Sequence, residues 1–264
     1  MKAKTPIFHG GDEKTGVVIL LHRMKFLTED GIEEIPIISG NAIRGVLRRI
    51  AMKDFFDQIG YEIDVESKKG IYLYHAFFSG GILETVEEKE SGVIDIAMKK
   101  RIFSLLPPVR LFGFSYKNQM VTGKLKVGHA LPVCRELRDF LPSDVKSEIS
   151  YYDMIGKCFQ TRKDELRIER EENEQAVQKL IEYEVFNPGT IFYHEFKIED
   201  PEEIDLSCFA RVLNLWKERP YVGGKSSIGL GELQINYDFD GEEGRYLHFL
   251  KEKRKEIIDL LESL

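Results

Sequence analysis

Residues 221–233 restrict the fold of this chain more than any other stretch, because four glycines lie among thirteen residues (YVGGKSSIGLGEL). Glycine permits positive φ angles and lets the backbone come close to a ligand. Lys225, Ser226 and Ser227 add hydrogen-bond donors to the exposed amides of such a loop. The composition predicts an anion-binding loop with backbone positions at Gly223, Gly224 and Gly229. A glycine-rich connection without a ligand is the alternative.

The segments on either side set the direction of this loop. Residues 206–219 have the pattern of a helix that stops before Pro220, and alternating apolar residues over 233–239 predict a half-buried strand. A nucleotide-binding P-loop instead joins a strand to a helix, and it needs a glycine where this chain has Arg219. An enzyme that binds a nucleotide or another small molecule through this loop is therefore a remote expectation.

The overall composition bounds the classes of function. The formal net charge is −7, so any contact with nucleic acid must come from local basic patches. The three cysteines lie far apart, which fits a reducing compartment and predicts neither a disulfide frame nor a zinc site. No signal peptide or membrane-spanning run is evident, so we expect a soluble cytoplasmic protein that does not bind membranes.

A second important segment spans residues 39–50. Its apolar residues recur at helical spacing, which predicts a helix that begins near Ser39 or Asn41 and turns one stripe toward the core. Arg44 and Arg48 lie one turn apart on its flank, close to a helix start that favours anions. We expect both arginines to contact phosphate. Ordinary surface ion pairs are the alternative.

Further cations cluster in two other places. Lys124 and Lys126 fall two residues apart, hence on one face of a strand, which suits the lining of a groove. A helix predicted over 93–106 carries the basic cluster Lys99, Lys100 and Arg101. For that cluster a solvated helical face is the alternative to an RNA contact.

The order of predicted elements indicates an α+β fold. A strand, a helix, a long interruption, two strands, a helix and a strand follow one another, which is the ferredoxin-like order shared with RNA-recognition modules. The named segments are a central strand at 16–22 covered on both faces, the helix at 39–50, a long strand at 190–198, the helix at 206–219 and the strand at 233–239. The charged residues 157–184 are expected to form an exposed arm or a helical pair.

Four motifs occur together in a fixed order along the chain. They lie at residues 35–48 (IPIISGNAIRGVLR), 110–113, 188–192 and 223–231. In this combination the chain resembles the RAMP superfamily of CRISPR-associated proteins, and within it the backbone subunits that bind CRISPR RNA in effector complexes. Residues 74–81 and 123–133 are more similar to the type IV and type I-D backbone subunits than to those of type III.

This resemblance implies a modified RNA-recognition palm with inserted fingers and a thumb. We expect the palm at residues 1–57 and 185–239, the fingers at 58–115, the thumb at 120–184 and a C-terminal helix at 240–264. The chain has no repeat or linker, so an independent second domain is not predicted. The expected partners are CRISPR RNA, further copies of this chain in a helical filament, other effector subunits, and a target DNA or RNA that pairs with the guide.

The resemblance also implies which residues hold the guide. A backbone subunit must accept any guide, so it should bind phosphates and sugars independently of sequence. The residues expected to bind RNA are Asn41, Arg44, Arg48, Lys99, Lys100, Arg101, Lys124, Lys126, Gly223, Gly224, Lys225, Ser226, Ser227 and Gly229. No cofactor is expected for this role.

The enzymatic alternative is an endoribonuclease of the same superfamily. Type III relatives cut target RNA with a divalent metal and an aspartate in the loop after the first strand, where this chain has Asp30 beside Glu29. An ordinary solvated turn at Asp30 and Gly31 is favoured over catalysis. The superfamily's guide-processing enzymes commonly rely on a histidine near the first helix, and His22 is the candidate near that place in this chain.

Overall fold

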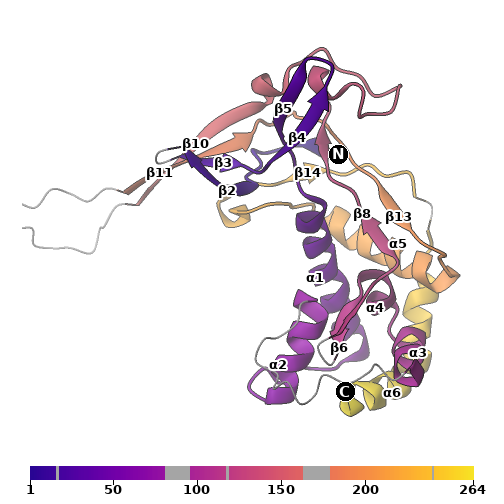
Figure 1. Ribbon diagram of the computed structural model, residues 1–264. Helices are drawn as coiled ribbons and strands as arrows, with labels where there is room; N and C mark the ends of the chain where they lie inside the picture. The colour runs from indigo at the N-terminus through magenta and orange to yellow at the C-terminus, as the bar shows by residue number, and fades with distance from the viewer. Residues whose placement is uncertain (16–17, 81–95, 117–118, 163–178, 240) are drawn as a thin grey trace, which may run out of the picture. The chain divides into compact units, whose positions relative to one another are not determined.

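The computed structural model describes residues 1–15, 18–80, 96–116, 119–162, 179–239 and 241–264 (Figure 1). These residues form two compact units, each built from interleaved segments of the chain. Unit 1 comprises residues 1–39, 129–194 and 220–235, and unit 2 comprises residues 40–128, 195–219 and 236–264. Both helices and strands are present, so the predicted α+β class is confirmed. In the described part of the chain, no helix is both long and apolar enough to cross a membrane.

Unit 1 contains a four-stranded sheet in the order β10-β11-β3-β2. Its strands are β2 (Gly10–Thr15), β3 (Val18–Leu21), β10 (Ile155–Arg162) and β11 (Lys179–Phe186). β3 pairs in parallel with β11 and antiparallel with β2, while β10 and β11 form a long antiparallel hairpin (Figure 1).

The predicted central strand is therefore present as β3, but it is not covered on both faces. Val18, Ile19 and Leu20 are half-buried. One face of the sheet packs Ile19 against Tyr183 and its neighbours. The opposite face of β11 carries Glu182 and Glu184, because successive side chains alternate along a strand.

A second hairpin and several short elements complete unit 1. β4 (Arg23–Thr28) pairs with β5 (Gly31–Pro36) and packs Phe26 and Ile35 into an apolar core. The short strand pairs are β1 (Lys2–Ala3) with β14 (Leu233–Gln234), and β9 (Leu131–Pro132) with β12 (Phe192–Tyr193). Single helical turns span Arg135–Leu137, Tyr151–Met154 and Ser226–Ile228.

Unit 2 is mainly helical. Its helices are α1 (Gly40–Ile59), α2 (Lys68–Tyr74) with a π-helical turn (His75–Ser79), α3 (Ile96–Leu105), α4 (Pro107–Phe112), α5 (Glu203–Glu218) and α6 (Gly244–Ser263). Its strands are β6 (Phe114–Tyr116), β7 (Gln119–Val121), β8 (Leu125–Val127) and β13 (Phe196–Ile198). α1 packs against α4, α5 and α6. The helices predicted at 39–50, 206–219 and the C-terminus are all confirmed.

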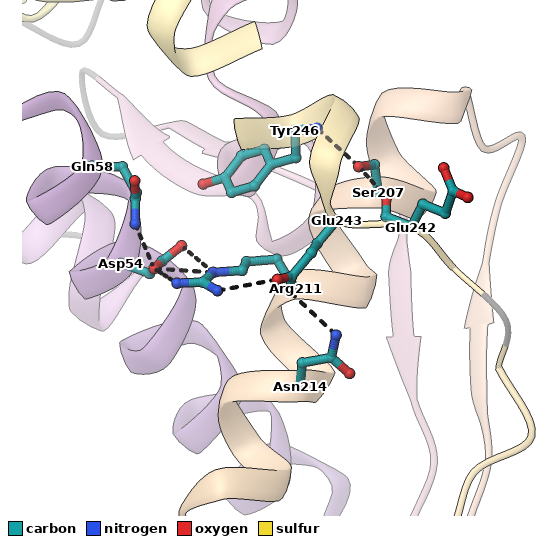
Figure 2. A network of polar contacts seen from close by, with 8 residues as sticks. All are labelled: Asp54, Gln58, Ser207, Arg211, Asn214, Glu242, Glu243 and Tyr246. Atoms are coloured by element: carbon teal, nitrogen blue, oxygen red, sulfur yellow. Dashed lines mark hydrogen bonds and ion pairs between the residues drawn. The ribbon is translucent and has the colours of Figure 1, made fainter. Parts of the chain in front are cut away.

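A polar network joins three of these helices (Figure 2). Arg211 of α5 donates to the carboxylate of Asp54 on α1, with Nη2 and Oδ1 2.8 Å apart. The same guanidinium pairs with Glu243, the residue before α6, at 3.4 Å. Its bond to Asp54 raises the pKa of Arg211. Ser207 Oγ accepts from the amide of Tyr246 and donates to the carbonyl of Glu242, which fixes the start of α6 on α5.

Three predicted elements differ from the structure. The long strand at 190–198 is divided into β12 and β13, which pair with different strands and belong to different units. The strand at 233–239 ends at Gln234, because Tyr237 packs against the rings of Phe196 and Trp216 instead of extending a ladder. Of the two alternatives for 157–184, the helical pair is wrong at the described ends, which are strands, and the exposed arm stays a prediction.

The ferredoxin-like palm with inserted fingers and thumb stays a prediction. The boundaries of the two units fall at other residues than the predicted boundaries of palm, fingers and thumb. The described part of the predicted thumb includes strand β10, which ends at Arg162, and strand β11, which begins at Lys179. Residues 163–178 lie outside the described residues.

Candidate nucleic-acid interface

An open groove of about 380 Å³ lies in unit 2 where α1 begins. It brings together three of the predicted site residues, Asn41 and Arg44 from α1 and Lys126 from β8. These two segments are separated by about eighty residues in the sequence, so only folding unites them. The groove is lined by Gly40, Asn41, Arg44, Thr122, Gly123, Leu125, Lys126 and Val127.

Gly40 allows α1 to begin this close to β8. A Cβ atom at Gly40 would overlap the carbonyl oxygens of Val127 and Gly128. Any side chain there would force the first turn of α1 away from the strand. The width of the groove therefore depends on a glycine at this position.

Arg44 and Arg48 point into unit 2 rather than outward from it. Arg44 donates to the carbonyl oxygens of Leu125 at 2.5 Å and Phe112 at 2.8 Å. Arg48, only 8% exposed, donates to the carbonyls of Phe77, Phe112 and Gly113. Burial lowers the pKa of both arginines, and the charge of Arg44 helps to bring that of Arg48 to about 10. Both remain charged at neutral pH.

Neither guanidinium has a carboxylate partner among the residues that the structure describes. Carbonyl oxygens satisfy their hydrogen bonds but supply only partial negative charge. Two like charges without a counter-ion in a poorly solvated place create a positive potential around them. Arg44 lines the groove, so that potential reaches the groove. The site is electrostatically suited to an anion.

Lys124 and Arg110 show the opposite arrangement. Both pair with the carboxylate of Asp205, which is fully buried, at 2.9 Å and 3.0 Å respectively. Glu202 adds a second negative charge to the cluster. This ion cluster joins α4 and the residue before β8 to the first turn of α5. Lys124 is thus neutralised within the protein, and we assign it a structural role.

Lys126 is exposed and remains accessible. Its ammonium pairs with Glu199 at 3.2 Å, and the two side chains are 46% and 64% exposed. Ion pairs between exposed side chains are weak and screened by salt. A phosphate can therefore displace Glu199 from Lys126 at little free-energy cost.

The basic cluster Lys99, Lys100 and Arg101 lies on α3 and is exposed. The ammonium of Lys99 lies 5.8 Å from the ring centre of Phe103. None of the three residues lines the groove. Their predicted contact with RNA stays a prediction.

The glycine-rich loop lies in unit 1 and has the conformation that its composition predicts. Gly223, Lys225 and Gly229 have φ angles of 78°, 64° and 88°. A Cβ atom at Gly223 would overlap the carbonyl oxygen of Phe8, and the amide of Gly224 donates to that oxygen at 2.8 Å. Ser226, together with the following residues of its helical turn, is exposed.

Lys225 folds back onto the four-stranded sheet. Its ammonium donates to Gln160 Oε1 at 2.8 Å and lies 4.5 Å from the ring centre of Tyr183. The same ammonium lies 5.7 Å from the ring centre of Phe8. Lys225 therefore anchors the loop to β10 and β11, and the exposed donors of the loop are at Ser226 and Ser227.

Asp30 lies in the tight turn between β4 and β5, as predicted for an ordinary turn. Gly31 has a φ of 120°, and Thr28 Oγ1 donates to its carbonyl oxygen at 2.9 Å. The neighbouring Glu29 pairs with Arg138 at 3.2 Å. Within the described ranges, no group of three or more His, Cys, Asp and Glu residues is arranged to hold a metal ion.

Two residues that are not among the predicted site residues, His9 and Arg49, have notable surroundings in the structure. His9 Nε2 accepts the amide of Ser39 at 3.2 Å, and its ring centre lies 5.4 Å from that of His22. Burial, and secondly the charge of His22, lowers the pKa of His9 to about 4. Arg49 is exposed on α1, whereas its neighbour Arg48 is buried. Arg49 follows Asn41 at helical spacing, but only the fold shows that Arg48 is buried and Arg49 is exposed.

Comparisons with known proteins found one matching family and similar solved structures. The model of the RAMP superfamily matches residues 1–234. A chain of a solved structure described as a type IV-B CRISPR complex is similar with a TM-score of 0.60 and 21% sequence identity. The match covers 92% of this chain and 94% of that chain. No curated protein sequence matches.

Proposed function

The chain belongs to the RAMP superfamily of CRISPR proteins, and from this membership we propose that it is a backbone subunit that binds CRISPR RNA in an effector complex. Its likeness in fold to a chain of a type IV-B complex supports this role. We further propose that several copies assemble along one guide, together with other effector subunits. The guide would then direct the assembly to a nucleic-acid target.

The observation that carries the proposal is the charge of the groove in unit 2. Arg44 and Arg48 lack carboxylate partners in the described part of the chain, and Lys126 adds an exposed ammonium at the rim. A phosphate in the groove would supply the missing negative charge. Asn41, exposed at the first turn of α1, adds an amide that can donate to phosphate or ribose oxygens.

This arrangement suits recognition that is independent of sequence. Guanidinium, ammonium and amide groups bind phosphate and ribose oxygens, which every nucleotide carries. We therefore assign phosphate contacts to Asn41, Arg44 and Lys126 in unit 2, and to the exposed side of the glycine loop in unit 1. Arg48 contributes charge from beneath the groove without touching the guide.

The hairpin of β10 and β11 supports a thumb within residues 120–184. It is a long two-stranded extension of the sheet in unit 1. The loop anchor Lys225 joins this hairpin at Gln160. We propose that the glycine loop and the base of the thumb contact the guide as one body.

The test is to purify the full chain from cells that carry a CRISPR array and sequence the RNA that remains bound. We expect large assemblies with high absorbance at the nucleic-acid wavelength, and guide RNAs that contain repeat and spacer sequences. Elution as a monomer free of RNA would contradict the proposal.

The same preparation tests the nuclease alternative. With a complementary target RNA and magnesium, a backbone subunit without catalysis leaves the target intact. Cuts at regular spacing that disappear in the Asp30→Ala variant would instead establish a target-cutting enzyme. A Glu29→Ala variant serves as the control, because its carboxylate is the neighbouring one in the same turn.

A further inference from the structure

One edge of α1 is exposed along most of the helix. Asn41, Gly45, Arg49 and Lys53 follow one another at intervals of four residues, so they form a row on one side of the helix. Asn41, Arg49 and Lys53 are exposed, and Gly45 is half-exposed. Each step advances about 6 Å along the helix axis, which is comparable with the length of one nucleotide in an extended strand.

The row carries two cations that nothing in the described structure neutralises. Arg49 and Lys53 form no ion pair with any described carboxylate. Arg48 is buried and Arg44 is half-buried at the groove, so Arg49 and Lys53 are the exposed cations of α1. Asp57, one turn further along, is exposed and ends the positive stretch.

Gly45 is not explained by packing against the residues that the structure describes. Among the described atoms, an added Cβ atom would meet Arg49 Nη1 alone, at an ordinary distance of 3.5 Å. Glycine inside a helix is unfavourable compared with alanine, because it leaves the backbone more freedom in the unfolded chain. Gly40 has a packing reason in the same helix, and for Gly45 the described neighbours supply none. Its bare backbone is therefore suited to close approach from outside the molecule.

We infer that a phosphate-binding track runs along this edge of α1, from Asn41 at the groove through Gly45 to Arg49 and Lys53. The guide leaves the groove, passes over the bare backbone at Gly45, and places successive phosphates at Arg49 and Lys53. This inference rests on the proposed function and specifies the path of the RNA on unit 2. It also replaces Arg48 with Arg49 as the second arginine of α1 that touches RNA.

The first test substitutes Gly45 with Gln, a good helix former. If the track passes here, Gly45→Gln raises the midpoint of thermal unfolding and at the same time weakens RNA binding. The smaller Gly45→Ala variant should stabilise the chain with a smaller loss of affinity. A variant that is more stable and binds RNA as tightly as the unmodified chain would overturn the path over Gly45.

The second test removes the two charges together. The double variant Arg49→Gln and Lys53→Gln is expected to bind RNA roughly tenfold more weakly, and equally so for RNAs of unrelated sequence. The control is Lys251→Gln with Lys255→Gln, an exposed pair at the same spacing on α6. Equal effects in the two double variants would overturn the track, since net charge alone would then explain them.

The outcomes separate this inference from the proposed function. Strong RNA binding by the unmodified chain, unchanged in the α1 double variant, keeps the proposed function and overturns the track. Absence of RNA binding by the unmodified chain overturns both. Binding that falls in the α1 variant and persists in the α6 control supports both.

Discussion

The part played by each arginine of α1 depends on the oxygen atoms that surround it. Arg48 donates to the carbonyls of Phe112 and Gly113 at the end of α4 and to that of Phe77, so its hydrogen bonds are used within the protein. Arg49, the next residue, is exposed and has no such acceptors in the described ranges. Helical spacing alone could not separate these two, because the backbone acceptors come from segments more than twenty residues away.

We predict that Arg48→Met destabilises the chain by about 2 kcal/mol or more, since it leaves buried carbonyl oxygens without donors. Arg49→Met should change the free energy of unfolding by no more than about 0.5 kcal/mol. Chemical denaturation of the two variants measures the difference. Equal effects would show that Arg48 is not a structural residue.

His9 makes the stability of unit 1 depend on pH. Its folded pKa of about 4 lies below the ordinary value of 6.5, because burial disfavours the charged ring. Between pH 6.5 and 4, His9 is protonated in the unfolded chain but stays neutral in the folded chain. The contribution of neutral His9 to the free energy of unfolding is therefore complete above pH 6.5 and is lost as the pH falls toward 4. We expect a loss of roughly 1–2 kcal/mol, allowing for partial exposure.

The control for this pH effect is His9→Gln. Glutamine can still accept the amide of Ser39, but it does not titrate. Unfolding followed over pH 6.5 to 4 should show a smaller loss of stability in this variant than in the unmodified chain. Identical losses would assign the effect to other groups.

Among the helices, the start of α1 controls the groove. Gly40→Ala should destabilise the chain by about 1–3 kcal/mol, because the new Cβ overlaps the carbonyl oxygens of Val127, the last residue of β8, and Gly128, which follows it. RNA binding should weaken with it as the groove deforms. Gly244→Ala is the matched control, since Gly244 begins a helix of the same length and an added Cβ there meets no atom of the described residues within 4 Å. It should be neutral or stabilising.

The helices of this chain could be predicted from sequence more accurately than the strands. Local signals define α5: a capping box at Glu202 and Asp205 begins it, and Pro220 follows its end. Strand length depends on partners that are distant in sequence. The apolar run at 190–198 is interrupted because β9 pairs with its first half and β8 with its second.

Over the chain as a whole, a net charge of −7 coexists with a local excess of positive charge at one groove. Sequence reasoning could propose Asn41, Arg44 and Lys126, because a helix start and strand alternation single them out, and the fold brings them together in one groove. It could not foresee that Lys124 is neutralised by Asp205 or that Lys225 lies against Tyr183. Those partners are brought together only by tertiary folding.

The measurement that decides whether phosphates bind at the groove is the affinity for single-stranded RNA as a function of salt concentration. We predict a steep fall in affinity for the unmodified chain, and a slope that is lower by about 0.7 in Lys126→Gln. Lys251→Gln on α6 should keep the full slope. A flat salt response of the unmodified chain, or an unchanged slope in Lys126→Gln, would contradict phosphate binding at this groove.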